Sequence, residues 1–383
     1  MVAVLFEDQT WPNYLPLVYT RPVGDLRIGI YTIAEKWALV LNCPVAHRTR
    51  GYLRELFPAS AEKDILLINA RVLPTEELVQ ALEELQEGEA LVQGDFFIAL
   101  KTDHESNDIG DSKKEFAGAL LRIDRITDIF SKNGQAIHED VSLWKNSNAF
   151  THPDDSVRVI GDPSKVFISP SANVVGCFLN TTDGPIIIDE DAEIMEGSMI
   201  RGPFYLGKHA GVKMGAKIYG PTTIGPYSKV GGEISNSVIQ AYSNKGHDGF
   251  LGNSILGEWC NLGADTNNSN LKNNYSPVKI WNYTFNDYVD TGLTFCGLIM
   301  GDHSKSGINT MFNTGTVVGI CANIFGAAFP DKHIPSFSWG GADGFEPYQL
   351  NKALETAQRM MARRNVSLTP EYIRMLEHLA QLV

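Results

Sequence analysis

The chain has 383 residues, of which 43% are hydrophobic and 20% charged, and its formal net charge is −13. This length is enough for two or three domains with a buried core. The acidic balance argues against a broad surface for nucleic acid, although a few local lysines or arginines can still hold an anionic small molecule.

The cysteines and the absence of long apolar runs bear on the compartment. Five scattered cysteines without a CxxC pair indicate reduced thiols in a reducing compartment, not a disulfide frame or a zinc site. The segment from Met1 to Asp8 has no basic region of the kind that opens a signal peptide, and no apolar run is long enough for a membrane span. We therefore expect a cytoplasmic protein without a membrane-spanning segment.

Residues 1–165 alternate between strand-like and helix-like patterns, which predicts an α/β domain. Such domains often bind nucleotides at the carboxyl ends of their strands, beside the first strand-to-helix loop. Arg21 and Arg27 lie in that loop and are candidate phosphate ligands, unless they pair with neighbouring acids. The expected strands are 2–6, 64–69, 90–92 and 96–100, and the expected helices are 32–41 and 74–85.

Residues 166–330 carry a six-residue repeat, which neither an α-helix nor an alternating strand can produce. The pattern predicts a triangular parallel β-helix, in which each unit gives one short strand and one corner and three units give one coil. Each coil buries its interior only against its neighbours, so several coils are needed. Aliphatic residues stand six apart at Ile188, Ile194, Ile200, Leu206, Val212, Ile218, Ile224 and Val230, and a mostly small residue follows four places after each.

The repeat fails at about 235–255 and again at about 266–298, and loops that leave a rigid scaffold often carry function. The first break holds His247 between Lys245 and Asp248, with glycines on both sides. An imidazole near its reference pKa can take a proton from an attacking amine at neutral pH. Lys245 or Lys217 could hold the charged end of a substrate. The alternative is a polar residue on a loop, and the residues alone leave both hypotheses open.

Residues 331–383 are expected to form a helical extension that packs against the prism or a neighbouring chain. Helices are predicted over 347–365 and 370–382, the second with a cap signal at Thr369 and Pro370. Three arginines of the first helix could meet an anionic ligand or could simply be solvated: Arg359, Arg363 and Arg364.

The stretch from Gly246 to Gly252, followed by Asn261 to Thr266 and by Asn270, resembles the active-site segment of the bifunctional GlmU family. That family combines N-acetylglucosamine-1-phosphate uridyltransferase with glucosamine-1-phosphate N-acetyltransferase activity. The shared pattern is G-H-x-x-[aromatic]-x-G, then N-[IL]-G-A-x-T and a downstream asparagine. The resemblance implies a left-handed parallel β-helix, a homotrimer and acetyl-CoA as co-substrate.

The same resemblance implies roles for individual residues. His247 would be the general base that deprotonates the sugar amine, and Asn261 would orient the substrate. Ala264 and Asn270 would line the acetyl-CoA groove, and Lys217 falls where the family has an arginine for the sugar phosphate.

Two positions depart from the family pattern and bear on the acceptor sugar. Phe250, the expected aromatic contact with substrate, stands where the family usually has tyrosine. Ser235 stands where a substrate-binding lysine is expected, a loss for which Lys245 could compensate.

The first domain resembles an alternative bacterial branch of this family, whose members are described as sugar nucleotidyltransferases. The resemblance runs over 15–22, 26–30 and 35–37. The usual glycine-rich phosphate loop is absent, and Asn69-Ala70-Arg71 stands where the common pattern has a Gly-Asp that supplies a magnesium ligand. UTP or dTTP as substrate and Mg²⁺ as a metal are implied by this resemblance alone.

Several hypotheses follow for the function. The first is a two-domain enzyme that acetylates an amino-sugar 1-phosphate and joins the product to a nucleotide, as in UDP-N-acetylglucosamine synthesis for the cell envelope. A variant of it keeps the acetyltransferase and makes the first domain non-catalytic or regulatory. A metal-dependent hydratase would need three converging histidines, and His209, His247 and His303 of the prism lack close ligand spacing. A scaffold protein with two decayed sites is the last alternative.

Overall fold

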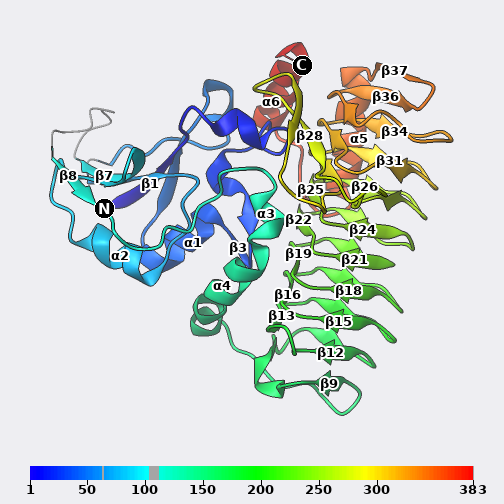
Figure 1. Ribbon diagram of the computed structural model, residues 1–383, viewed down its shortest axis with the longest axis horizontal. Helices are drawn as coiled ribbons and strands as arrows, with labels where there is room; N and C mark the ends of the chain where they lie inside the picture. Colours follow the sequence, from blue (N-terminus) through cyan, green and yellow to red (C-terminus); the bar gives the residue numbers. More distant parts are fainter. Residues whose placement is uncertain (63, 103–111, 383) are drawn as a thin grey trace.

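The computed structural model describes residues 1–62, 64–102 and 112–382. An N-terminal α/β domain lies against the flank of a parallel β-helix, and the coils of the β-helix stack beside it (Figure 1). Two C-terminal helices follow the last coils. This arrangement confirms the fold class expected from the sequence.

The N-terminal domain is built on a six-stranded sheet of order β4-β1-β5-β7-β6-β8. β1 pairs in parallel with β4 and β5 on its two sides, which gives a nearly continuous run of buried aliphatic side chains. The strands are β1 (Val2–Phe6), β4 (Val45–Arg48), β5 (Ile65–Asn69), β6 (Ala90–Gln93), β7 (Phe96–Thr102) and β8 (Lys113–Glu115). A separate pair is formed by β2 (Arg27–Ile28) and β3 (Tyr31–Thr32).

Local capping decides where the helices of this domain begin. Thr32 and Glu35 form a reciprocal capping box, so α1 starts at Ile33 as expected. Thr75 accepts a hydrogen bond from the Leu78 N–H, so α2 starts later than the predicted Pro74. α4 was not predicted. The helices are α1 (Ile33–Leu41), α2 (Glu76–Glu83), α3 (Asp128–Ser131) and α4 (Asn133–Ser147), with short 3-10 helices η1 (Trp11–Tyr14), η2 (Val23–Asp25), η3 (Gly51–Leu53) and η4 (Pro163–Lys165).

One face of the β-helix, here named the docked sheet, packs against the N-terminal domain. Ile30, Ile137 and Trp144 of the domain form an apolar cluster with Phe167, Ile187 and Tyr205 of the sheet. The docked sheet comprises β10 (Val166–Ile168), β13 (Ile186–Ile188), β16 (Phe204–Leu206), β19 (Thr222–Ile224), β22 (Val238–Ala241), β25 (Ile255–Glu258), β30 (Ile299–Met300), β33 (Val317–Val318) and β35 (His333–Ile334).

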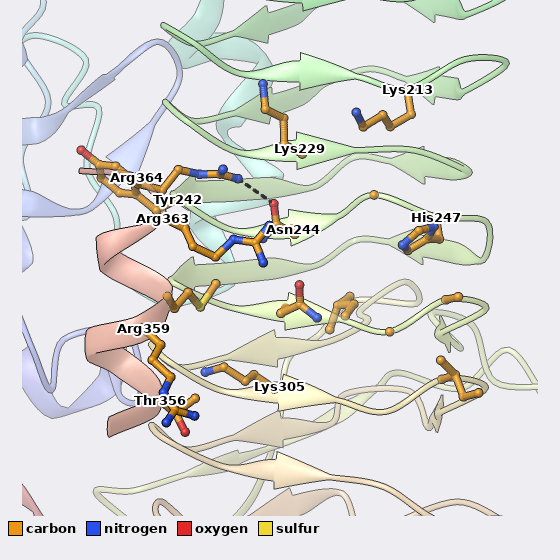
Figure 2. Close-up of a pocket in the computed structure, with 17 residues that line it drawn as sticks. Lys213, Lys229, Tyr242, Asn244, His247, Lys305, Thr356, Arg359, Arg363 and Arg364 are labelled. Carbon is orange, nitrogen blue, oxygen red and sulfur yellow. Dashed lines mark hydrogen bonds between the residues drawn. The ribbon is translucent and has the colours of Figure 1, made fainter. Parts of the chain in front are cut away.

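A second face, the groove sheet, is partly covered by the first C-terminal helix (Figures 1 and 2). It comprises β11 (Asn173–Val174), β14 (Glu193–Ile194), β17 (Gly211–Val212), β20 (Lys229–Val230), β23 (Asn244–Lys245), β26 (Asn261–Leu262), β31 (Lys305–Ser306), β34 (Asn323–Ile324), β36 (Ser338–Gly341) and β37 (Gly344–Pro347). The C-terminal helices are α5 (Leu350–Ala362) and α6 (Pro370–Leu382); α5 begins after the predicted residue 347 because Pro347 ends β37.

The third face, the open sheet, exposes several large apolar side chains. Ile160, Phe178, Met199 and Tyr219 are each nearly half exposed on it. The open sheet comprises β9 (Arg158–Ile160), β12 (Phe178–Asn180), β15 (Met199–Arg201), β18 (Lys217–Tyr219), β21 (Glu233–Ser235) and β24 (Phe250–Gly252). Strand pairing in the β-helix thus begins at Arg158 and ends at Pro347, beyond the expected range of 166–330 on both sides.

A column of stacked rings runs along the corner between the docked sheet and the groove sheet. Tyr227, Tyr242 and Trp259 stack with ring centroids 4.9 and 4.2 Å apart. All three have left-handed backbone, with φ between 53° and 60°, a conformation that costs bulky residues free energy. Repeating the strained corner in each coil brings the rings together, and ring stacking offsets part of that cost.

The coil is continuous through the first predicted break, so the expectation of a loop leaving the scaffold at 235–255 is wrong. Val230 pairs with Lys245, fifteen positions on, whereas Val212 and Val230 are eighteen apart. The corners contain fewer residues here, so the six-residue spacing is lost from the sequence. The strands of successive coils nevertheless pair in register. The second break, by contrast, holds an insertion with the antiparallel hairpin β28 (Lys279–Asn282) and β29 (Asp287–Asp290), after β27 (Asn267–Asn268), which pairs with β32 (Met311–Phe312).

Candidate active site

The groove sheet carries a ladder of polar side chains in adjacent coils. Lys229 pairs with Asn244, Asn244 with Asn261, and Asn261 with Lys305. Because successive residues of a strand point to opposite faces, these side chains stand outside the prism while Val230 and its equivalents stand inside. In-register parallel pairing therefore gathers two amides and two ammonium groups on one face.

Helix α5 lies beside this ladder and adds arginines to it (Figure 2). The small residues Ala353 and Ala357 are buried on the inner side of the helix, which allows a close approach. Arg363 and Arg364 extend from its C-terminal end toward the ladder, and the Arg364 Nη2 donates to the Asn244 Oδ1 at 3.2 Å. The helix thus forms one wall of a groove and the sheet forms the other.

The groove has a volume of about 710 Å³, within the range of a cofactor site. Its walls include six cationic side chains and no aspartate or glutamate among the described residues: Lys213, Lys229, Lys305, Arg359, Arg363 and Arg364. Only Arg359 among them makes an ion pair within the described residues, with Glu355. This concentration of positive charge, in a chain of net charge −13, suits a ligand with several negative charges.

The lysines of the groove have a reduced proton affinity. Burial lowers the pKa of Lys229, and the charges of Arg364 and Lys213 lower it further. Burial also lowers the pKa of Lys305, whose Nζ donates to the His303 carbonyl at 2.7 Å. An anion in the groove would raise both pKa values, so binding an anion and keeping these lysines charged favour one another.

His247 lies at the end of the groove opposite α5, at the corner where the groove sheet passes into the open sheet (Figure 2). Its side chain is exposed, and within the described residues its imidazole makes no hydrogen bond. Both ring nitrogens are therefore available to a substrate. The groove brings His247 together with Asn261 and Ala264, three of the residues expected from the sequence.

The backbone around His247 is held from inside the prism. Lys245 takes an inward position, is 2% exposed, and its Nζ donates to the carbonyls of His247 and Asp248. Gly249 has φ +110°, and a Cβ there would lie 2.2 Å from the Thr266 carbonyl oxygen, so this position requires glycine. The expectation that Lys245 contacts substrate is wrong, because its ammonium group is used to fix the corner that carries His247.

Three other predicted residues lie outside this groove. Lys217 stands on the open sheet, in a shallow cavity of about 370 Å³ with Arg201 and Tyr219. The Phe250 ring covers Gly252 beside the Asn270 amide, and the Asn270 Nδ2 donates to the Asn253 Oδ1 at 2.8 Å. Ala264 and Asn270, expected together in the acetyl-CoA groove, are therefore on different sides of the corner.

Arg21 and Arg27 are both buried. Arg21 is buried between the domains, where it pairs with Glu258 at 2.8 Å and with Asp302. Arg27 is buried against Gln240 of β22, whose carbonyl accepts from its Nε at 3.2 Å. Their predicted role as phosphate ligands is contradicted, because both guanidinium groups are used to attach the N-terminal domain to the β-helix.

The structure also brings in residues that the sequence did not single out. Lys213, Lys229, Asn244 and Lys305 line the groove, and none has a motif of its own. Their spacing along the chain is irregular, because coils of different length separate them. Only the coil register, with Val230 opposite Lys245, would have placed them on one face.

No group of three or more histidine, cysteine, aspartate or glutamate residues in the described parts of the chain has the geometry of a metal site. Within the same residues, no helix combines the length and the apolar character needed to span a membrane.

Comparison with known proteins agrees with both halves of this architecture. Residues 3–148 match the family model described as sugar nucleotidyl transferase. The chain is 31% identical over 160 residues to the uncharacterized acetyltransferase YaiX of Escherichia coli O6:K15:H31, covering 41% of this chain and 69% of YaiX. It is 32% identical over 153 residues to the bifunctional sugar-1-phosphate nucleotidylyltransferase/acetyltransferase of Sulfurisphaera tokodaii, and 33% identical over 104 residues to the bifunctional protein GlmU of Methanocaldococcus jannaschii.

The chain belongs to a GlmU-like family. The matches cover 39% and 27% of this chain and 38% and 25% of the S. tokodaii and M. jannaschii proteins, so the chain spans well under two thirds of these GlmU-like relatives.

Solved structures resemble the GlmU-like chain only loosely. The polySia-specific acetyltransferase NeuO is 15% identical, with a TM-score of 0.32, over 55% of this chain and 99% of NeuO. A mutant of AntD, an N-acyltransferase from Bacillus cereus, in complex with dTDP-4-amino-4,6-dideoxyglucose and coenzyme A, is 12% identical, with a TM-score of 0.23, over 54% and 90%. At these values no inference about function is drawn from them.

Proposed function

We propose that the protein transfers an acetyl group from acetyl-CoA to the amine of an amino-sugar 1-phosphate and joins the product to a nucleotide. The observation that carries the first half is the cationic groove that ends at His247. Acyl transfer from CoA to an amine is favoured by cations that bind the polyanionic donor and by a base that takes the amine proton, and the groove offers both.

In the proposed acetyl transfer, His247 acts as the general base. The amine attacks the thioester carbon while the imidazole takes its proton, so a C–N bond forms and a tetrahedral oxyanion results. The C–S bond then breaks, and the departing CoA thiolate takes the proton from the His247 imidazolium, which restores the neutral imidazole. Asn261, which lines the same groove as His247, would orient the reacting groups with its side-chain amide.

The groove is the proposed site of acetyl-CoA, which carries a diphosphate and a 3′-phosphate. Arg363, Arg364 and Lys213 supply cations for those phosphates, and guanidinium groups bind phosphate in a bidentate manner. Ala264, which also lines the groove, would offer a small side chain beside the thioester end.

The acceptor is proposed to bind on the open-sheet side of the corner, where Lys217 would hold its phosphate. The exposed apolar residues of that sheet support a homotrimer in which copies pack through this face and complete the acceptor site. Changing Met199 to Glu should then give monomers in light scattering. The matched control, Met214→Glu, changes a methionine that is 70% exposed outside the open sheet, and it should leave the assembly unchanged. A wild-type monomer would contradict the trimer.

The nucleotidyl half is proposed from the family-model match to residues 3–148. Its substrates would be the acetylated sugar 1-phosphate and UTP or dTTP, which gives UDP-N-acetylglucosamine or a related nucleotide sugar.

A coupled assay tests the whole proposal. A panel of amino-sugar 1-phosphates is incubated with acetyl-CoA, and CoA thiol release is followed; UTP or dTTP is then added, and pyrophosphate is measured. We expect thiol release with at least one amino sugar and pyrophosphate only after acetylation. The absence of amine-dependent thiol release across the panel would overturn the acetyltransferase assignment.

A further inference from the structure

Two carboxylates and one guanidinium group meet at the carboxyl edge of the N-terminal sheet. Asp8 follows β1, Arg71 follows β5, and Asp124 precedes α3. The Arg71 Nε and Nη2 lie 3.0 and 2.7 Å from the Asp8 Oδ2, and its Nη1 lies 3.0 Å from the Asp124 Oδ1. The guanidinium group therefore lies between the two acids.

The lone pairs of Asp8 are already in use. Its Oδ1 accepts from the backbone N–H and the hydroxyl of Thr10 at 2.9 and 2.5 Å, and its Oδ2 accepts from the Asn69 amide at 3.0 Å as well as from Arg71. A carboxylate offers about four acceptor positions. Burial by itself would raise the pKa of Asp8, but these hydrogen bonds and the Arg71 charge lower it.

Asp124 is 40% exposed on its side chain, and a second guanidinium group donates to it. The Arg122 Nε lies 2.9 Å from its Oδ1 and 3.1 Å from its Oδ2. The guanidinium groups of Arg122 and Arg71 lie 4.0 and 4.9 Å from the Phe96 ring centroid, which holds both in place. Two acids and two arginines give a neutral cluster, so no negative charge is left for a divalent ion to neutralise.

These residues do not fit a magnesium ion. Mg²⁺ requires oxygen ligands at about 2.0–2.1 Å in octahedral geometry. The guanidinium group fills the space between the two carboxylates, and the side chain of Arg71 is only 11% exposed. An ion could bind only after the three hydrogen bonds from Arg71 to these acids were broken.

We propose that Arg71 takes the place of a magnesium ion at this edge, so that Asp8 and Asp124 hold no divalent cation. This inference does not rest on the acetyl transfer proposed above. A magnesium ion carried by a nucleoside triphosphate could still reach the edge, held by the phosphates and not by these acids.

The test is Mn²⁺ binding to the full chain without nucleotide, followed by electron paramagnetic resonance. Wild type is expected to bind no Mn²⁺ that depends on Asp8 and Asp124. Arg71→Met removes the guanidinium group that lies between the two carboxylates, although Arg122 still pairs with Asp124. This variant should gain about one Mn²⁺ per chain, given the oxygen ligands then available. Adding Asp8→Asn to Arg71→Met should abolish the gain. Arg71→Lys keeps a cation in place and should bind no Mn²⁺.

Two results would overturn the proposal. One is a wild-type chain that binds one Mn²⁺ and loses it in the Asp8→Asn variant. The other is a folded Arg71→Met variant that gains no Mn²⁺. Circular dichroism reports folding, and Arg71→Gln, also neutral, serves as the second variant if Arg71→Met does not fold. Since no turnover is measured, failure here is separate from failure of the coupled assay.

Discussion

The cations of this molecule fall into two groups that differ in their partners. In the groove, Lys213, Arg363 and their neighbours stand without acids on the walls. In and beside the N-terminal domain, Arg21 and Arg71 are each bonded to two carboxylates. The same residue types therefore have two different roles. A cation paired with a carboxylate fixes structure, and a cation without an acid partner in a cavity is available to an anion. Charge alone therefore does not identify a binding site, because what stands opposite each cation must also be known.

The largest expected effect comes from breaking a paired cation. Arg21 is 5% exposed on its side chain and Asp302 is 1% exposed, and burial raises the pKa of Asp302 while the Arg21 charge opposes that rise. Arg21→Met would leave Asp302 buried without its cation and should lower the free energy of unfolding by about 3–5 kcal/mol. Urea unfolding measures this.

A matched control is Arg125→Met, which also removes an arginine that contacts the β-helix. Among the described residues of the β-helix, Arg125 donates only to the Thr291 carbonyl, at 3.0 Å, so the loss should be much smaller. Equal losses in the two variants would contradict the assignment of Arg21 as the main ionic link between the domains.

A smaller effect, on substrate binding and not on stability, is expected from a groove cation without an acid partner. Arg363→Ala should raise the KM for acetyl-CoA about tenfold, the worth of one charge-assisted hydrogen bond, and leave the stability unchanged. The control is Arg374→Ala on α6, whose guanidinium pairs with Glu55 away from the groove. An unchanged KM in Arg363→Ala would place the phosphates elsewhere.

A pH-dependent effect concerns Lys245, a buried cation bonded, within the described residues, only to carbonyl groups. Burial lowers its pKa from 10.5 to about 8. Between these values the unfolded chain holds the proton and the folded chain does not, so the free energy of unfolding contributed by this group rises with pH in that window and is constant below it.

Subtracting the unfolding free energy of Lys245→Met from that of wild type isolates this contribution. The difference should grow in favour of wild type as the pH is raised above about 8. A difference that stays constant up to pH 10.5 would mean that Lys245 keeps its proton in the folded state.

The sequence predicts the regular parts of the molecule well and its contacts poorly. The six-residue period reveals the β-helix because each coil repeats the same inward positions, and the G-H motif contains Gly249, which a contact with the Thr266 carbonyl oxygen requires. The roles of Lys245, Arg21 and Arg27 could not be predicted from the sequence, because each role depends on the groups that the side chain contacts after folding. A shortened corner turns Lys245 inward, and the docked sheet supplies partners of both arginines.

The most direct test of the acetyl transfer is the loss of turnover in His247→Ala. With acetyl-CoA and the amino sugar 1-phosphate that wild type prefers, removing the general base should slow thiol release by about 10²–10⁴-fold. His209→Ala, at a half-buried corner histidine outside the groove lining, should release thiol at the wild-type rate. Wild-type thiol release from a folded His247→Ala variant would contradict the role of His247 as the base and, with it, the assignment of the groove.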